Sequence, residues 1–202
     1  KEELGISTRY VALYSGNLAN KQGLEILPDM ARRLAERKDL SFVVCGGGPM
    51  REKLRQAADG LKNFRLLDLQ PTHRLNDLLG MADVHLLPQI AGAADLVMPS
   101  KLTNMLASGR PVLATAAPDT ALGREVNGAG RIVPPGDAEA AARTLCAMLD
   151  APEERAAMGA EARRRALERW DMSIVMQRFL AELRDLAGPN TVEIGSNGRE
   201  RA

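Results

Sequence analysis

Residues 95–114 have the sequence Asp95-Leu-Val-Met-Pro99-Ser100-Lys101-Leu-Thr-Asn104-Met-Leu-Ala-Ser-Gly109-Arg-Pro111-Val-Leu-Ala114. At a helical period, the apolar side chains after Ser100 share one arc and the polar ones share the other. A proline is tolerated at the start of a helix, and Gly109 can end the helix before the apolar run that follows Pro111. The stretch therefore predicts a polar loop, a short helix and a buried strand.

The start of this predicted helix has the features of an anion site. The first turn of a helix has free backbone N–H groups and a partial positive charge, and Lys101 lies beside them. Pro99, Ser100 and Lys101 are therefore candidate ligands of a phosphate or diphosphate group. Asn104 lies one turn further along the polar arc.

Short apolar runs alternate with amphipathic segments along the rest of the chain. Continuously apolar strands separated by helices indicate crossover connections and a parallel sheet covered on both faces. We therefore predict a doubly wound, Rossmann-like α/β domain with a six-stranded parallel sheet. The predicted strands are residues 10–15, 41–45, 64–67, 84–87, 112–115 and 131–133.

Helix signals define the connecting segments and the C-terminal part of the chain. Connecting helices are predicted at residues 23–37, 49–58, 72–81 and 120–127. Asp137, Pro152 and Asp171 then begin three consecutive helices that reach about residues 149, 169 and 186. The predicted organisation is a linker at 1–9, a Rossmann-like domain at 10–170, a C-terminal helix at 171–187 and a polar tail at 188–202.

The composition argues against several classes of function. Among 202 residues, 27 basic and 26 acidic side chains give a net charge of +1, and only 3% are aromatic, which disfavours binding to nucleic acid. Cys45 and Cys146 form no Cys-x-x-Cys pair and no Asp-x-Asp cluster occurs, so we expect no disulfide, no metal and no cofactor. No apolar run approaches the ~20 residues that cross a bilayer, and the start is not a signal peptide, which predicts a cytoplasmic location.

Two further features have structural interpretations. Gly46-Gly-Gly48-Pro49 follows a predicted strand, but a G-x-G-x-x-G dinucleotide fingerprint would need glycine where Arg51 stands. We predict a tight strand-to-helix turn there. His85 lies inside a predicted strand with no acidic or thiol neighbour in the sequence, so we predict a packed, hydrogen-bonded side chain.

Four stretches resemble, in order, the donor-nucleotide half of GT-B glycosyltransferases, and among them the retaining glycosyltransferase family 4. They are residues 14–23, 43–49, 82–88 and 99–112, within a resemblance that covers about residues 10–187. Residues 89–101 are most similar to bacterial exopolysaccharide transferases of the colanic-acid type. The resemblance implies a C-terminal donor-binding domain, an N-terminal Rossmann-like domain that is missing here, and a last helix that packs back on that domain.

The resemblance also implies roles for the loop after the first strand. In the family, a basic residue follows the glycine of this loop and a lysine directly precedes the next glycine, and both reach the donor phosphates. Those positions hold Asn17 and Gln22 here, with Lys21 one place away. Gly16, Asn17 and Lys21 are therefore candidate phosphate ligands. Gln70, after the third predicted strand, is the candidate contact for the nucleobase.

Family members usually carry two glutamates, separated by seven residues, that contact the transferred sugar and the ribose. These positions fall on Leu96 and Asn104 here. The Asn104 amide can still hydrogen-bond a ribose hydroxyl, although without charge. Asp95 is one residue from the first position, and it is our candidate for the sugar contact and for a catalytic residue.

The implied function is metal-free, retaining transfer of a sugar from a UDP- or GDP-sugar to a saccharide or lipid-linked acceptor in bacterial polysaccharide biosynthesis. The full-length protein would act in the cytoplasm, at the inner face of the cell membrane. Because the acceptor site falls on the missing domain, we expect this chain alone to bind without turnover. Two alternatives stay open: a sugar-nucleotide epimerase of the same architecture, and a non-catalytic nucleotide-binding module, which the loss of both glutamates suggests.

Overall fold

The computed structural model describes residues 1–20, 22–91 and 98–187 of the chain. All six predicted strands are present, and two of them begin one residue earlier than predicted. The strands are β1 (Tyr10–Ser15), β2 (Leu40–Cys45), β3 (Phe64–Leu67), β4 (Val84–Leu87), β5 (Val112–Thr115) and β6 (Gly130–Val133).

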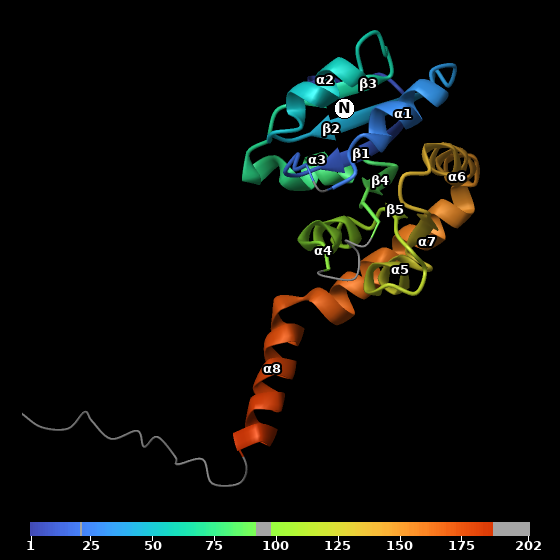
Figure 1. Cartoon of the computed structure of the whole chain (residues 1–202). Helices are drawn as coiled ribbons and strands as arrows, with labels where there is room; N and C mark the ends of the chain where they lie inside the picture. The colour runs from blue at the N-terminus through green and yellow to red at the C-terminus, as the bar shows by residue number, and fades with distance from the viewer. Residues whose placement is uncertain (21, 92–97, 188–202) are drawn as a thin grey trace, which may run out of the picture.

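These strands form one six-stranded sheet with the order β3-β2-β1-β4-β5-β6. Every pair is parallel, for example Leu13 beside Val43 and Leu86 beside Leu113. Helices lie on both sides of the sheet (Figure 1). The prediction of a doubly wound, Rossmann-like α/β domain is confirmed. The strand order reverses direction between β1 and β4, and such a switch point is where doubly wound sheets bind ligands.

The predicted helices are present with different ends. They are α1 (Ile26–Arg33), α2 (Arg51–Ala57), α3 (Leu75–Gly80), α4 (Ser100–Ala107), α5 (Ala121–Val126), α6 (Ala138–Asp150), α7 (Pro152–Arg165) and α8 (Met172–Ala187). Two short 3-10 helices are also present, η1 (Glu2–Leu4) and η2 (Thr72–Arg74). Helix α1 begins three residues later than predicted because Gly23 has φ +66°, outside the right-handed helical region.

The side chains of β1 alternate between two cores. Tyr10, Ala12 and Tyr14 pack on one face of the sheet, which α1 and α6 cover, whereas Val11 and Leu13 pack on the other face with α3. Both faces are buried, as the apolar sequence of this strand predicts. The side chain of Tyr14 is therefore fixed in the core on one face of the sheet, and its hydroxyl lies near the carboxyl edge of the sheet.

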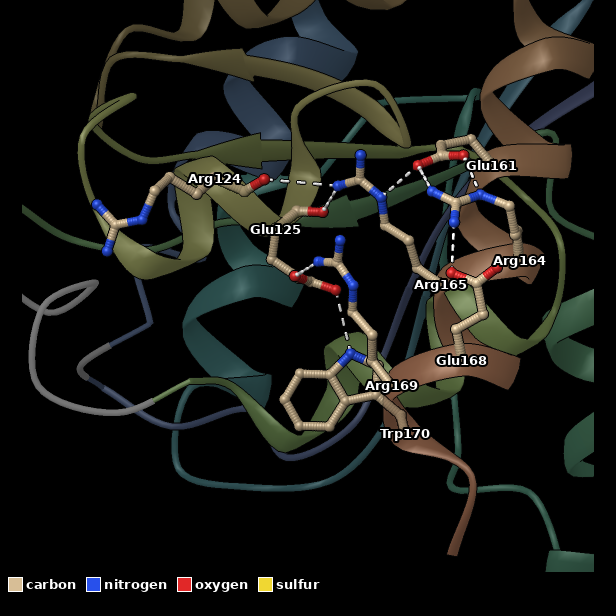
Figure 2. Close-up of polar contacts among 8 residues, drawn as sticks. All are labelled: Arg124, Glu125, Glu161, Arg164, Arg165, Glu168, Arg169 and Trp170. Atoms are coloured by element: carbon tan, nitrogen blue, oxygen red, sulfur yellow. Dashed lines mark hydrogen bonds and ion pairs between the residues drawn. The ribbon is translucent and has the colours of Figure 1, made fainter. Parts of the chain in front are cut away.

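The last turn of α7 is replaced by a π-helical turn, η3 (Ala166–Trp170). Figure 2 shows the polar contacts made there, which we call the Glu125 cluster. The carboxylate of Glu125, on α5, accepts hydrogen bonds from Arg169 Nη1 at 2.7 Å and from Trp170 Nε1 at 3.1 Å. Arg165 donates to the Glu125 carbonyl oxygen at 2.5 Å and to Glu161 at 2.6 Å. The chain is helical up to Trp170, close to the predicted end at about residue 169, and the π form of the last turn, which was not predicted, is held by contacts with α5.

Helix α8 begins directly after the Glu125 cluster, and Asp171 accepts a hydrogen bond from Ser173 N at its start. It extends away from the α/β body (Figure 1). Its exposed apolar side chains recur at helical spacing, namely Met172, Val175, Met176, Phe179, Leu180, Leu183 and Leu186. Within the described residues, no helix is long and apolar enough to span a membrane.

Candidate functional site

Lys101 is the centre of the candidate site. It belongs to the first turn of α4, and its Nζ reaches the carboxyl end of β1. The ammonium donates to the hydroxyl of Tyr14, to Gln22 Oε1 at 2.9 Å and to the carbonyl oxygen of Asn17 at 3.3 Å. We call these three acceptors and the lysine the Lys101 cage. The cage joins segments 79 and 87 residues apart in the sequence.

The cage depends on close approaches of the backbone. A Cβ atom on Gly16 would lie 2.5 Å from Lys101 Cε, so the lysine occupies the space that a larger residue would fill. The glycine turn after β2 approaches the loop that follows β1, which contains Gly16 and which we call the β1 loop. A Cβ atom on Gly46 would lie 1.9 Å from the Gly16 carbonyl oxygen, and Leu18 N donates to Gly47 O at 2.8 Å. The prediction of a tight strand-to-helix turn is confirmed, and the turn supports the β1 loop.

The cage holds a half-buried cation that has no counter-ion among the described residues. Burial lowers the pKa of Lys101 from its usual range to about 8, because the charged form loses hydration. Burial also raises the pKa of the Tyr14 phenol, so this hydroxyl stays neutral. Its single proton has two acceptors in reach, Asn17 O at 2.7 Å and Gln22 Oε1 at 2.5 Å. All the cage oxygens are neutral, and the lysine charge is left uncompensated within the described part of the chain.

The amino end of α4 lies next to the cage. Pro99 occupies the N-cap position, and no side chain in the described residues caps the first turn. Leu102 N bonds back to Pro99 O at 2.9 Å, and Ser100 is exposed. The apolar arc of Leu102, Met105 and Leu106 is buried, as predicted. An exposed helix end with a positive dipole and a lysine beside it can bind an anion.

The structure brings only part of the predicted site together. Gly16, Asn17 and Lys101 meet in the cage, with Ser100 and Pro99 beside it. Asn104 instead lines a cavity of about 530 Å³ between α3 and α4, together with Asn76 and Arg163. Gln70 lines a second cavity of about 680 Å³ between η1 and α3. Lys21 and Asp95 lie outside the described residues.

His85 has the structural role that the sequence predicted. It is fully buried in β4, and its Nε2 lies 2.9 Å from Ser108 Oγ. The Ser108 hydroxyl donates to Met105 O at 2.6 Å, so it accepts from the imidazole. Burial, with a smaller contribution from Arg110, lowers the pKa of His85 to about 3. The ring is neutral and links β4 to the end of α4.

Three residues in or near the site were missed by sequence reasoning. Tyr14 was placed in a strand and in a family stretch without a role in the site, and Gln22 was noted only as a departure from the family pattern. Asn76 was not considered, yet it lines both cavities and lies between Gln70 and Asn104. A tyrosine at the carboxyl end of a buried strand is a weak signal that could have been used, because a buried hydroxyl needs a partner.

Comparison with known proteins places this arrangement in an enzyme family. The glycosyl transferases group 1 family matches residues 9–151. The chain therefore belongs to this family, and its parallel sheet and helices have the Rossmann-like fold found in GT-B glycosyltransferases.

Two relatives come from Escherichia coli (strain K12). The putative colanic acid biosynthesis glycosyl transferase WcaI is 44% identical over 116 residues, which are 56% of this chain and 28% of the relative. The putative colanic acid biosynthesis glycosyltransferase WcaL is 29% identical over 175 residues, which are 82% of this chain and 42% of the relative. The chain thus spans less than half the length of either relative.

Solved structures show the same fold at low sequence identity. Anabaena Alr3699/HepE in complex with UDP has a TM-score of 0.77 at 18% identity, over 90% of this chain and 50% of that one. Sucrose-phosphate synthase from Thermosynechococcus elongatus has a TM-score of 0.76 at 20% identity, over 92% of this chain and 48% of that one.

Proposed function

We propose that this chain is the donor-binding half of a retaining, family 4 glycosyltransferase. It would bind a nucleoside-diphosphate sugar and serve transfer to a saccharide or lipid-linked acceptor in bacterial exopolysaccharide synthesis. Family membership and the names of the colanic acid relatives support the reaction class. The observation that carries the binding role is the Lys101 ammonium at the carboxyl edge of the sheet, which has no counter-ion among the described residues and lies beside the first turn of α4.

The donor diphosphate is assigned to the space over Gly16 and the first turn of α4. The Lys101 ammonium and the backbone N–H groups of α4 would face the phosphate oxygens, and the helix dipole adds to their field. Charge grows on the leaving diphosphate during sugar transfer. Fixed donors at that point lower the energy of the transition state without a metal ion.

The rest of the donor is assigned to the neighbouring residues. The ribose would lie near Asn104, and the nucleobase near Gln70, with Asn76 between them along α3. The sugar is assigned to Asp95, which remains the candidate catalytic residue. Asp95→Ala should leave nucleoside-diphosphate affinity unchanged and lower affinity for the whole sugar nucleotide. Equal losses for both ligands would reduce Asp95 to a residue that shapes its loop.

The acceptor is assigned to a second Rossmann-like domain, as in a two-domain GT-B enzyme. The chain covers 50% of the HepE chain, which is consistent with one domain of two. We expect the chain alone to show neither transfer nor hydrolysis of a nucleotide sugar. Turnover by the isolated chain would contradict this assignment.

Calorimetry against UDP, GDP, dTDP and their nucleosides tests the binding role. The cognate diphosphate should bind far better than its nucleoside, and Lys101→Ala should weaken it by about 1.5 to 3 kcal/mol, the range for a charge-assisted hydrogen bond. Lys62→Ala is the matched control, because Lys62 is exposed and precedes β3 at the opposite edge of the sheet. Equal affinity for nucleoside and diphosphate would exclude the proposed site.

Full-length protein separates a transferase from the alternatives. Nucleotide release from a sugar nucleotide that depends on an added acceptor supports transfer. Conversion of the sugar without an acceptor would instead identify an epimerase. Binding without either reaction would identify a non-catalytic nucleotide-binding module. Binding that survives a chelator supports the metal-free site, and a requirement for magnesium would contradict it.

A further inference from the structure

We propose that Tyr14 and Gln22 are positioning residues that hold the Lys101 ammonium where the donor diphosphate binds, and that positions 22 and 101 can exchange the positive charge that Lys101 contributes. This inference rests on the proposed function, because it places the diphosphate of the same donor. The residues reach a common point from opposite sides, Gln22 from the β1 loop and Lys101 from α4.

The number of hydrogen bonds supports a positioning role. A lysine ammonium has three protons, and Lys101 Nζ has three acceptors in the cage. A free lysine side chain samples many rotamers and loses this freedom when it binds an anion. The cage removes most of that freedom in advance. Tyr14 is the rigid residue of the cage, since its side chain is fully buried in the core against the sheet.

The neutrality of the cage is as important as its geometry. A carboxylate at position 22 would pair with Lys101 at about the same distance, and would cancel the charge available to a phosphate. A second ammonium at position 22 would repel Lys101. An amide oxygen avoids both effects, because it orients the ammonium and leaves its charge uncompensated.

The distances also indicate which contact the anion replaces. The Asn17 carbonyl, at 3.3 Å, is the longest of the three acceptor distances, and Asn17 is exposed. A phosphate oxygen entering over the β1 loop would therefore replace Asn17 O. Lys101 would keep its hydrogen bonds to Tyr14 and Gln22 in the bound state.

A charge-exchange series tests the proposal, with UDP and GDP as the titrated ligands. Lys101→Gln and the nearly isosteric Gln22→Glu should each weaken binding by about ten- to a hundredfold, the factor for loss of one charge-assisted hydrogen bond. The double variant Gln22→Lys with Lys101→Gln should recover most of the wild-type affinity. A double variant as weak as Lys101→Gln would overturn the exchange.

A measurement without nucleotide separates this proposal from the proposed function. The pKa of Lys101 can be followed by NMR of ¹³Cε-labelled lysine. Gln22→Glu should raise that pKa, because an opposite charge favours the ammonium. Tyr14→Phe and Gln22→Met should lower the pKa, because each removes a hydrogen-bond acceptor of the ammonium. Unchanged values in these folded variants would overturn the positioning role even if nucleotide binds. Shifted values in a protein that binds neither UDP nor GDP would leave the cage in place and contradict the donor site.

Discussion

A Cβ atom on Gly16 would lie 2.5 Å from Cε of Lys101. Gly16→Ala should therefore displace the lysine side chain from the cage. The protein should still fold, because the contact is with the flexible part of a side chain, although φ of +140° adds backbone strain of about 1 to 3 kcal/mol. We expect diphosphate affinity to fall to the level of Lys101→Ala, as measured by calorimetry.

Gly60→Ala is the control for the strain in this prediction. Gly60 has φ +75°, and a Cβ atom placed on it would meet nothing within 4 Å. This variant should lose stability in urea unfolding with no change in diphosphate affinity. If Gly16→Ala binds diphosphate as well as Gly60→Ala does, the close approach at Gly16 has no part in binding.

Diphosphate affinity should depend on pH through Lys101. The pKa of Lys101 is about 8 in the folded chain, so the binding-competent ammonium is lost as pH rises above this value. Affinity should then fall by up to about tenfold per pH unit. Lys101→Arg stays charged throughout this range, and its comparison with the wild type removes any titration of the nucleotide itself. Parallel pH profiles of the two proteins would contradict the assignment.

The same shift predicts that Lys101 costs stability at neutral pH. The folded pKa lies below the unfolded value of 10.5, so between these two values the unfolded chain binds more protons. Stability should therefore rise with pH from 8 to 10.5, and the cost should be fully present below pH 8. Lys101→Met should raise the urea midpoint at pH 7 and should weaken diphosphate binding as much as Lys101→Ala does. A midpoint unchanged at pH 7 would show that the ammonium is well solvated.

Asn104 should contribute to binding of the ribose and not to binding of the diphosphate. Asn104→Glu should preserve or tighten binding of the nucleoside diphosphate, because an ionised acceptor forms stronger hydrogen bonds to hydroxyls. Asn104→Leu should weaken it. Neither change should affect binding of inorganic pyrophosphate, which lacks the ribose. A parallel loss for pyrophosphate would show that Asn104 acts on the phosphate site.

Glu125 should hold the start of α8. Its side chain is 10% exposed and bonds both Arg169 and Trp170. Glu125→Ala should lower the free energy of unfolding by about 1 to 3 kcal/mol, because it removes a nearly buried carboxylate that accepts hydrogen bonds from two side chains. Trp170 is the one tryptophan of the sequence, so its fluorescence reports the loss directly. Glu182→Ala, an exposed acidic residue on α8, should change neither quantity.

The sequence by itself determined the secondary structure and the fold class. The apolar run of β1, the Asp137 and Asp171 caps and the stop at Gly109 are local features, and hydrophobic period and capping act within a few residues. The parallel order of the sheet followed from short strands alternating with helices. The family motifs also located the carboxyl edge of the sheet as the place for a ligand.

Only the tertiary structure decided which side chains meet at that edge. Lys101 reaches Tyr14 across 87 residues, and no local pattern encodes that distance. The neighbouring position Asn104 points instead into the groove beside α3, since successive turns of α4 face different elements. The π turn at Trp170 likewise depends on Glu125, 45 residues earlier. Such contacts arise because side chains far apart in sequence are packed at one place, and sequence periodicity carries no information about their pairing.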